Sequence, residues 1–386
     1  MTWAATVATG TNVYAAVSDD GAATFGAPVR VNDVDGDARV NGEQPPRVAI
    51  GADIVVAWMS RLTGVSRIRM ARSVDGGRTF TPAATAHSET LAGARGWQSL
   101  AIDTGNRVHA AWLDGRDANR GAPVNQPTSA RPVVPTNQGA ATSPHAMHKS
   151  SRQDIFHAVW RPDGKALEAR VATDVCFCCK TSVATGPDQT TYVAFRHIYP
   201  TNLRDMAVAR SIDGGLTFDA PVRVSEDHWQ ISGCPEDGPS IAVAVDGTLH
   251  IAWPTLIQSP DATRKAIFYS YSTDRGRTFA PRMRVDDSGE GSRTAAHPQL
   301  TVAGSIVVVV WDESGPRGRQ VRLAEITSSS PAAWTPASSA PLSLSGEDRG
   351  VYPAVASVSG TPIVAWTAEA AEASVVRVLR IARGRR

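Results

Sequence analysis

The sequence lacks the features that define several large protein classes. Its longest uninterrupted apolar run, Ile306 to Trp311, is far shorter than the roughly 20 residues that a membrane-spanning helix needs. With 39 basic and 37 acidic residues, the formal net charge is only +2, too small for the strongly basic face of a nucleic-acid-binding protein. The stretch after Met1 has neither a basic segment nor a continuous apolar core, so no secretory signal peptide is recognisable. We therefore expect neither a membrane span nor a nucleic-acid partner.

Cysteine is also scarce, with four residues in a chain of 386. That number is too small for a disulfide scaffold at this length. Three of the four nevertheless lie together in Cys176-Phe177-Cys178-Cys179, and the fourth is Cys234. Such crowding calls for a specific role, either in metal binding or in disulfide bonds.

Short apolar runs are abundant, and they recur as a strand that ends in an aromatic residue. Together with 32 glycines and 25 prolines, this pattern is typical of many short strands joined by tight turns. The aromatic residues are spaced 54 to 58 residues apart, with one interval of 83. The six predicted strands end at Trp58, Trp112, Phe195, Trp253, Trp311 and Trp366.

A second repeat, Ser-x-Asp-x-Gly-x-Thr-Phe, follows several of these strands. Intact copies span 73–80, 211–218 and 272–279, and a weaker copy spans 18–25. Serine and aspartate side chains can bind the backbone of a turn, glycine accepts positive φ, and the phenylalanine can anchor the hairpin. The repeat therefore predicts a structural turn and not a catalytic motif.

These motifs resemble the Asp-box, or BNR, repeat of the sialidase superfamily. The resemblance covers nearly the whole chain and implies an all-β, six-bladed β-propeller with four-stranded antiparallel blades, which agrees with the six aromatic-ended strands. We expect a single propeller over residues 1–386, with a proline-rich loop insertion at about 114–153 that carries His145, Met147 and His148. The N-terminal stretch around Tyr14 to Val31 is expected to join the C-terminal strands and close the ring.

Propeller geometry predicts which polar residues share a face. In an antiparallel blade, the start of the first strand and the end of the second lie on one side of the disc, whereas the Asp-box turns lie on the other. All four cysteines and most of the charged residues thus fall on one funnel face. Glu43, Gln44, Asp237 and Asp312 belong to it as well.

The cysteines support a first hypothesis, in which the funnel face of an extracytoplasmic protein holds a Cys/His metal centre. Thiolate and imidazole ligands suit copper, with zinc as a weaker alternative, and a copper centre would make the protein an oxidoreductase. The candidate ligands are Cys176, Cys178, Cys179, Cys234, His197 and His297. The competing interpretation is two disulfides, for instance between Cys234 and one cysteine of the cluster, in which case there is no cofactor.

The resemblance to sialidases supports a second hypothesis, an exo-glycosidase that acts on an acidic sugar. Sialidases use a tyrosine nucleophile activated by a glutamate, an aspartate acid and an arginine triad that binds the sugar carboxylate. The matching catalytic positions are Tyr352, Glu236 and Asp114, and the matching substrate-binding positions are Arg61, Arg196, Arg293 and Trp97. The chain departs from the family where Gln44-Pro45-Pro46 replaces the Arg-Ile-Pro motif, which makes it a divergent member and removes one triad arginine.

A third hypothesis is a non-catalytic propeller that binds glycans or proteins, with Trp97, Trp229 and Tyr352 as stacking platforms. In each case the expected ligand is a small molecule or a glycan, and the expected state is a monomer. Metal content and turnover of an aryl sialoside distinguish the three.

Overall fold

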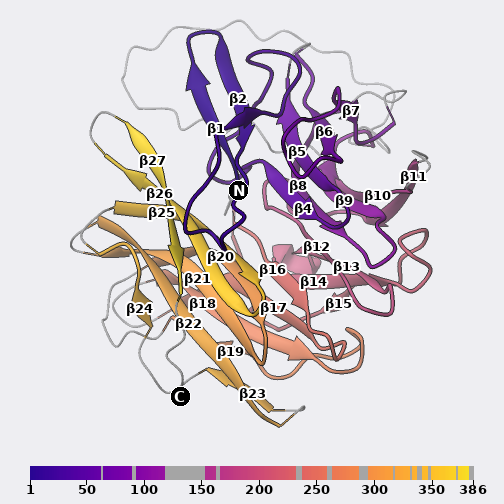
Figure 1. Ribbon diagram of the computed structural model, residues 1–386. Helices are drawn as coiled ribbons and strands as arrows, with labels where there is room; N and C mark the ends of the chain where they lie inside the picture. Colours follow the sequence, from indigo (N-terminus) through magenta and orange to yellow (C-terminus); the bar gives the residue numbers. More distant parts are fainter. Residues whose placement is uncertain are drawn as a thin grey trace, which may run out of the picture.

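The computed structural model describes residues 1–61, 64–88, 93–117, 153–161, 166–231, 237–258, 263–286, 294–315, 318–330, 333–336, 341–346, 349–370 and 373–381. These residues form antiparallel sheets that follow one another around the molecule in chain order (Figure 1). Among the described residues, no helix is long and apolar enough to cross a membrane. The fold is thus an all-β propeller, as predicted.

The first four sheets comprise residues up to Arg223, together with a short 3-10 helix at Pro200–Asn202. The first sheet has three strands and the next three have four each. Their strands are β1 (Thr2–Val7), β2 (Gly10–Ala15) and β3 (Val29–Arg30); β4 (Arg47–Ile50), β5 (Ile54–Ser60), β6 (Arg67–Ser73) and β7 (Ala84–Thr85); β8 (Arg95–Ile102), β9 (Val108–Asp114), β10 (Asp154–Trp160) and β11 (Ala166–Ala172); and β12 (Ser182–Thr185), β13 (Thr191–Arg196), β14 (Met206–Ser211) and β15 (Val222–Arg223).

The last three sheets contain the remaining strands, with four, five and three members. They are β16 (Ser240–Val243), β17 (Leu249–Gln258), β18 (Thr263–Ser272) and β19 (Met283–Arg284); β20 (Thr294–Ala303), β21 (Ile306–Gly315), β22 (Gly318–Ser330), β23 (Ala333–Pro336) and β24 (Leu342–Ser343); and β25 (Arg349–Val358), β26 (Thr361–Glu369) and β27 (Ser374–Arg380).

The prediction of six blades is wrong in number, because the described residues form seven sheets. Residues 2–30 form a sheet of their own and do not pair with the C-terminal strands. Val13 and Ala15 of this sheet pack against Trp58 and Val56 of the next one. Counting aromatic-ended strands missed it, because its tryptophan, Trp3, stands near the start of β1.

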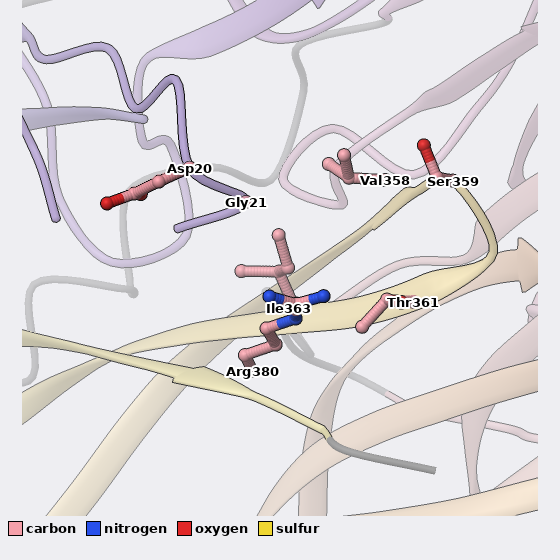
Figure 2. Close-up of a pocket in the computed structure, with 7 residues that line it drawn as sticks. All are labelled: Asp20, Gly21, Val358, Ser359, Thr361, Ile363 and Arg380. Atoms are coloured by element: carbon pink, nitrogen blue, oxygen red, sulfur yellow. The ribbon is translucent and has the colours of Figure 1, made fainter. Parts of the chain in front are cut away.

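The turn motif shows which strands the first sheet contains. In the other sheets that carry it, the motif connects the third strand to the fourth, whereas the copy at 18–25 connects β2 to β3. The described part of the first sheet therefore corresponds to strands two to four of a blade, and the last sheet to strands one to three. Where the two approach each other, Asp20 and Gly21 face Ile363 and Arg380 across a shallow pocket of about 270 Å³ (Figure 2). The predicted site residues are not among those that line this pocket.

The aromatic residue that recurs in the second strands belongs to the core. Trp58, Trp112, Trp253 and Trp311 are fully buried, and Phe195 is almost so. Each of the four indole N–H groups donates to a carboxylate near the end of its blade, for example Trp311 Nε1 to Glu313 Oε2 at 3.2 Å. Burying an unpaired indole N–H is costly, and these bonds avoid that cost. They also link the buried tryptophans to carboxylates of the charged funnel face.

The turn motif is structural, which confirms its prediction. In all four copies the serine hydroxyl donates to the aspartate at 2.7 Å, and the threonine hydroxyl donates to the same carboxylate at 2.6 Å. In the copy at 211–218, burial raises the pKa of Asp213, but hydrogen bonds from these hydroxyl groups outweigh burial and lower the pKa. The aspartate carboxylate is thus hydrogen-bonded within its own turn and is not available for chemistry.

The predicted insertion at about 114–153 connects β9 to β10, which pair directly from Asp114 opposite Asp154 onwards. The insertion therefore begins at the end of the second strand of this blade and ends at the start of its third strand, on the funnel face. Most of it, with His145, Met147 and His148, lies outside the described residues.

Candidate functional site

Three of the first strands begin with the same irregularity on the funnel face. β8, β20 and β25 each contain a β-bulge, and one residue of each bulge has a left-handed backbone conformation. These residues are Trp97 (φ 53°), His297 (φ 56°) and Tyr352 (φ 52°). A non-glycine residue in this conformation costs about 1–3 kcal/mol, and such residues cluster at functional sites.

Each bulge is held by a side chain of an earlier blade, either from just before its first strand or from its second strand. The amide N–H of the left-handed residue donates to this side chain, which accepts through a single oxygen. The bonds run from Trp97 to Gln44 Oε1 at 3.0 Å, from His297 to Asp237 Oδ2 at 3.0 Å, and from Tyr352 to Asp312 Oδ2 at 2.7 Å. Contacts between sheets therefore fix the backbone of three side chains that begin their strands on the funnel face.

His297 lies between two carboxylates. Its Nδ1 is 2.7 Å from Asp312 Oδ2 and its Nε2 is 2.6 Å from Glu43 Oε1. Burial lowers the pKa of His297, but the bonds to Asp312 and Glu43 outweigh it and raise the pKa to about 9. At neutral pH the ring is a cation that donates from both nitrogens, so neither lone pair is free for the metal-ligand role predicted for His297.

Tyr352 is the exposed member of this cluster, with 38% of its surface accessible. Its ring centroid is 4.5 Å from that of His297. The Tyr352 ring also lies against Gly42, where a Cβ atom would overlap the ring. Burial raises the pKa of Tyr352, and the nearby charges of Glu43 and Asp312 raise it further. The Oε2 atom of Glu43 is buried and has no hydrogen-bond partner.

A second layer of charge lies behind His297. Asp237 is completely buried, with Lys180 Nζ 3.7 Å from one carboxylate oxygen and Lys265 Nζ 3.5 Å from the other. Burial opposes ionisation of Asp237, but Lys265, Lys180 and His297 hold its pKa far below the usual range. The ammonium group of Lys180 is also 3.4 Å from the carbonyl oxygen of Pro298. The funnel therefore has a nearly neutral network of buried ion pairs.

The cysteines form a compact cluster beside this network. Cys176 Sγ is 2.9 Å from Cys179 Sγ and 4.0 Å from Cys178 Sγ. Cys178 is disulfide-bonded, and its partner lies outside the described residues, as does Cys234. Cys176 and Cys179 are free and buried. The interpretation as two disulfides is therefore wrong, because among the described cysteines only Cys178 is disulfide-bonded and Cys176 and Cys179 are free thiols.

The two free thiols differ in acidity. A hydrogen bond from Cys179 lowers the pKa of Cys176 to about 6, against burial, and the charges of Arg196 and Arg204 lower it further. Burial raises the pKa of Cys179 well above its ordinary value. The Nη1 atom of Arg204 is 3.6 Å from Cys176 Sγ. Cys176 is therefore the thiolate of the pair and Cys179 its hydrogen-bond donor.

Two residues predicted to contact substrate are instead part of the protein interior. Arg196 is 1% exposed, and its guanidinium donates to the carbonyl oxygens of Arg204 and Pro254, both at 2.9 Å, while stacking on Trp229. Asp114 is also 1% exposed. Its carboxylate accepts bonds from the side chains of Arg95, Trp112 and Arg116. Both side chains are thus buried and hydrogen-bonded inside the protein, although the Nε atom of Arg196 has no partner.

The other predicted residues have more open surroundings. Arg61 is exposed, and its Nε donates to the carbonyl oxygen of Gly64 at 3.1 Å. Trp97 is half-buried and packs on the cysteines, and its Nε1 has no partner. His197 lies 4.7 Å from the ring of Tyr199 and has a partnerless Nδ1, and burial lowers its pKa. Glu236 and Arg293 lie outside the described residues.

Glu43, Asp237 and Asp312 were predicted to lie on this face, but no role was predicted for them. Their place on the face could be read from the sequence, because Glu43 and Asp237 precede first strands and Asp312 lies near the end of a second strand. What sequence spacing could not indicate is that all three converge on one histidine. Arg319 was missed altogether, although it pairs with Asp312.

Together, the propeller and its funnel cluster define the class of protein: the chain has a sialidase-like β-propeller fold. Its sequence matches no known protein family and no curated protein. Among solved structures, it is similar to a leech intramolecular trans-sialidase complexed with 2,7-anhydro-Neu5Ac, with 10% identity, a TM-score of 0.56, and coverage of 96% of this chain and 73% of that one.

Two further structures have the same fold. One is a variant of the NanB sialidase from Streptococcus pneumoniae, with 10% identity, a TM-score of 0.53, and coverage of 91% of this chain and 69% of that one. The other is a protein of unknown function from Dyadobacter fermentans, with 14% identity, a TM-score of 0.52, and coverage of 89% and 96%. At these identities the likeness shows the fold alone.

Proposed function

We propose that the protein is an extracytoplasmic glycoside hydrolase that acts, as a monomer, on a glycan with an acidic terminal sugar. The observation that carries the proposal is an exposed phenol, Tyr352, whose pKa is raised by burial and by the charge of Glu43, together with the buried Oε2 atom of Glu43, which has no hydrogen-bond partner. A disulfide at Cys178 supports the extracytoplasmic location, because disulfides persist in oxidising compartments.

In this proposal Tyr352 is the nucleophile. Tyr352 gives its phenolic proton to Glu43 as its oxygen attacks the anomeric carbon; the bond from that carbon to the aglycone oxygen breaks, and the leaving oxygen takes a proton from solvent. Water then attacks the same carbon of the covalent glycosyl intermediate, the bond to Tyr352 breaks, the Tyr352 oxygen recovers the proton from Glu43, and the second proton of the water returns to solvent. The phenol needs a base because its pKa is raised, and Glu43 is the described carboxylate whose charge acts on it most strongly. Glu43 thus takes the role that the sequence assigned to Glu236.

The surrounding charges would hold the nucleophile and its substrate in place. His297 occupies one oxygen of Glu43 and leaves the other as an acceptor. Arg319 is linked to Tyr352 through Asp312, which accepts the Tyr352 amide, and the Arg319 side chain is 26% exposed. With Arg61, it is a candidate for binding the sugar carboxylate, since arginine matches carboxylate geometry.

Replacing Tyr352 by phenylalanine tests the proposal. We expect the wild type to hydrolyse an aryl sialoside or an aryl uronide, and Tyr352→Phe to lower kcat/KM by at least about 10³-fold, the scale on which loss of a nucleophile acts. An aryl leaving group needs little protonation, so this substrate tests the nucleophile independently of an acid.

The control is Tyr14→Phe, which alters a tyrosine that stacks on Trp3 in the first sheet. It should retain wild-type turnover. Equal activity of Tyr352→Phe and wild type, or a wild type inactive on both aryl glycosides, would rule out the proposed reaction and leave a glycan-binding function for this face.

A second candidate function is copper-dependent redox chemistry. It is favoured by one observation, that ligand atoms of Cys176, Cys178 and Cys179 lie within 4.8 Å of one another. Because Cys178 is disulfide-bonded, the thiolates of Cys176 and Cys179 would be the ligands, with the open Nδ1 of His197 as a candidate third. Thiolates select soft ions such as Cu(I).

Metal analysis of protein purified without chelator tests this candidate. If these thiols bind metal, the wild type contains about one equivalent of copper, or of zinc, and Cys179→Ser loses it. The control is Ser182→Ala, three residues further along, which changes no thiol and should retain the metal. Metal-free wild-type protein excludes the candidate.

A further inference from the structure

The two free cysteines are spaced as a Cys-x-x-Cys pair and are close enough to react with each other. Cys176 and Cys179 are the first and last residues of a tight turn, and their sulfur atoms are 2.9 Å apart. That distance is well inside the van der Waals contact of two sulfur atoms and about 1 Å longer than a disulfide bond. Cys178, which lies between them in sequence, is already oxidised and so does not compete.

The surroundings of the pair supply a charged group and an apolar cover. Arg204 approaches Cys176 from across the cluster, at 3.6 Å, while Trp97 and Phe177 pack against the sulfur atoms. Thiols of this kind, next to a guanidinium and paired as Cys-x-x-Cys, are typical of exchange-active dithiols. Structural cysteines, by contrast, lack both a charged partner and a resolving thiol.

We propose that Cys176 and Cys179 form a reversible dithiol–disulfide couple that small disulfides such as oxidised glutathione can close. The Cys176 thiolate attacks one sulfur of the glutathione disulfide, and one glutathione thiolate leaves. Cys179 then loses its proton and attacks the Cys176 sulfur of the mixed disulfide, which expels the second glutathione. Overall, two cysteine thiols are oxidised to one disulfide, and one glutathione disulfide is reduced to two thiols.

Closure would act on the funnel site through the chain itself. Cys179 is followed directly by Lys180, whose ammonium group pairs with Asp237, and Asp237 in turn holds the amide of His297. Movement of the Cys179 sulfur towards Cys176 is therefore coupled to the ion pair behind the cluster. The proposed couple does not depend on glycosidase activity.

Thiol mapping across a glutathione redox series tests the proposal. The native, full-length protein is equilibrated at graded ratios of reduced to oxidised glutathione, then denatured in acid and alkylated. Cleavage after Arg170 and Lys180 yields the peptide 171–180, which contains all three clustered cysteines and stays joined to a second peptide through the Cys178 disulfide. We expect Cys176 and Cys179 both alkylated at the reducing end and both protected, with the loss of two hydrogens, at the oxidising end.

The Cys176→Ser and Cys179→Ser variants provide the matched comparison. In either variant, the remaining cysteine should stay alkylatable or carry one glutathione at every ratio. If a variant does not fold, the thiol map of the wild-type protein still tests the proposal. Persistence of both thiols under oxidising conditions, a disulfide from Cys178 to either thiol, or bound metal that blocks alkylation until a chelator is added would each overturn the couple.

Discussion

Raising the pH from 6.5 to above 9 should remove about 3 kcal/mol of stability that His297 contributes to the folded protein. The pKa of His297 is about 9 in the folded state, whereas the ordinary pKa of histidine is 6.5, and this difference corresponds to about 3 kcal/mol. Because the folded-state pKa is the higher one, the contribution is complete below pH 6.5 and is lost as the pH rises through 9. Chemical denaturation at a series of pH values measures it.

The His297→Gln variant is the control for this titration. It lacks the ionisable ring, so its free energy of unfolding should fall less over the same pH range, and the difference between the two proteins isolates His297. Buried histidines such as His157, whose pKa is lowered to about 3, titrate below this window and do not interfere. Parallel pH profiles for wild type and variant would show that the two carboxylates do not bind a histidine cation.

Replacing Asp312 by alanine should destabilise the protein by about 3–5 kcal/mol, the cost of breaking a buried ion pair from one side. The Asp312 side chain is fully buried and serves three groups: the His297 ring, the Tyr352 amide and the Arg319 guanidinium. Its loss would leave a cation and a strained amide without their acceptor. Denaturant titration at pH 7 measures the change.

The matched control is Asp53→Ala. Asp53 pairs with Arg72 at 2.9 Å, but both side chains are partly exposed, so its loss should cost at most about 1 kcal/mol. Asp312→Asn, which keeps one carbonyl acceptor, should fall between the two. A cost for Asp312→Ala no greater than that for Asp53→Ala would contradict the structural role assigned to Asp312.

Much of the fold could be predicted because its determinants are local and repeated. The hydroxyl and carboxylate groups of each Ser-x-Asp turn bond within eight residues, so the motif behaves in the same way in every sheet. The tryptophans at the ends of second strands are likewise buried by their own and adjacent blades. The number of sheets was not predictable, since the first sheet lacks an aromatic-ended second strand of the common form.

The site was harder to predict, because the function of a charged side chain depends on its partners. The resemblance to sialidases suggested roles in chemistry for Asp114 and Arg196, yet each is bonded to several neighbours in the interior. Glu43 and His297 are 254 residues apart, and no sequence pattern links them. Only the approach of the last sheets to the first part of the chain brings them together.

By itself, the sequence determined the all-β class, the turn chemistry, the buried tryptophans and the end of the propeller at which polar residues gather. These properties follow from hydrogen bonds and burial within a blade, over short distances along the chain. The tertiary structure decided how many sheets form, which cysteine is oxidised, and which carboxylates meet His297. Those outcomes depend on contacts between sheets, where desolvation makes each buried charge require a partner that can lie anywhere in the sequence.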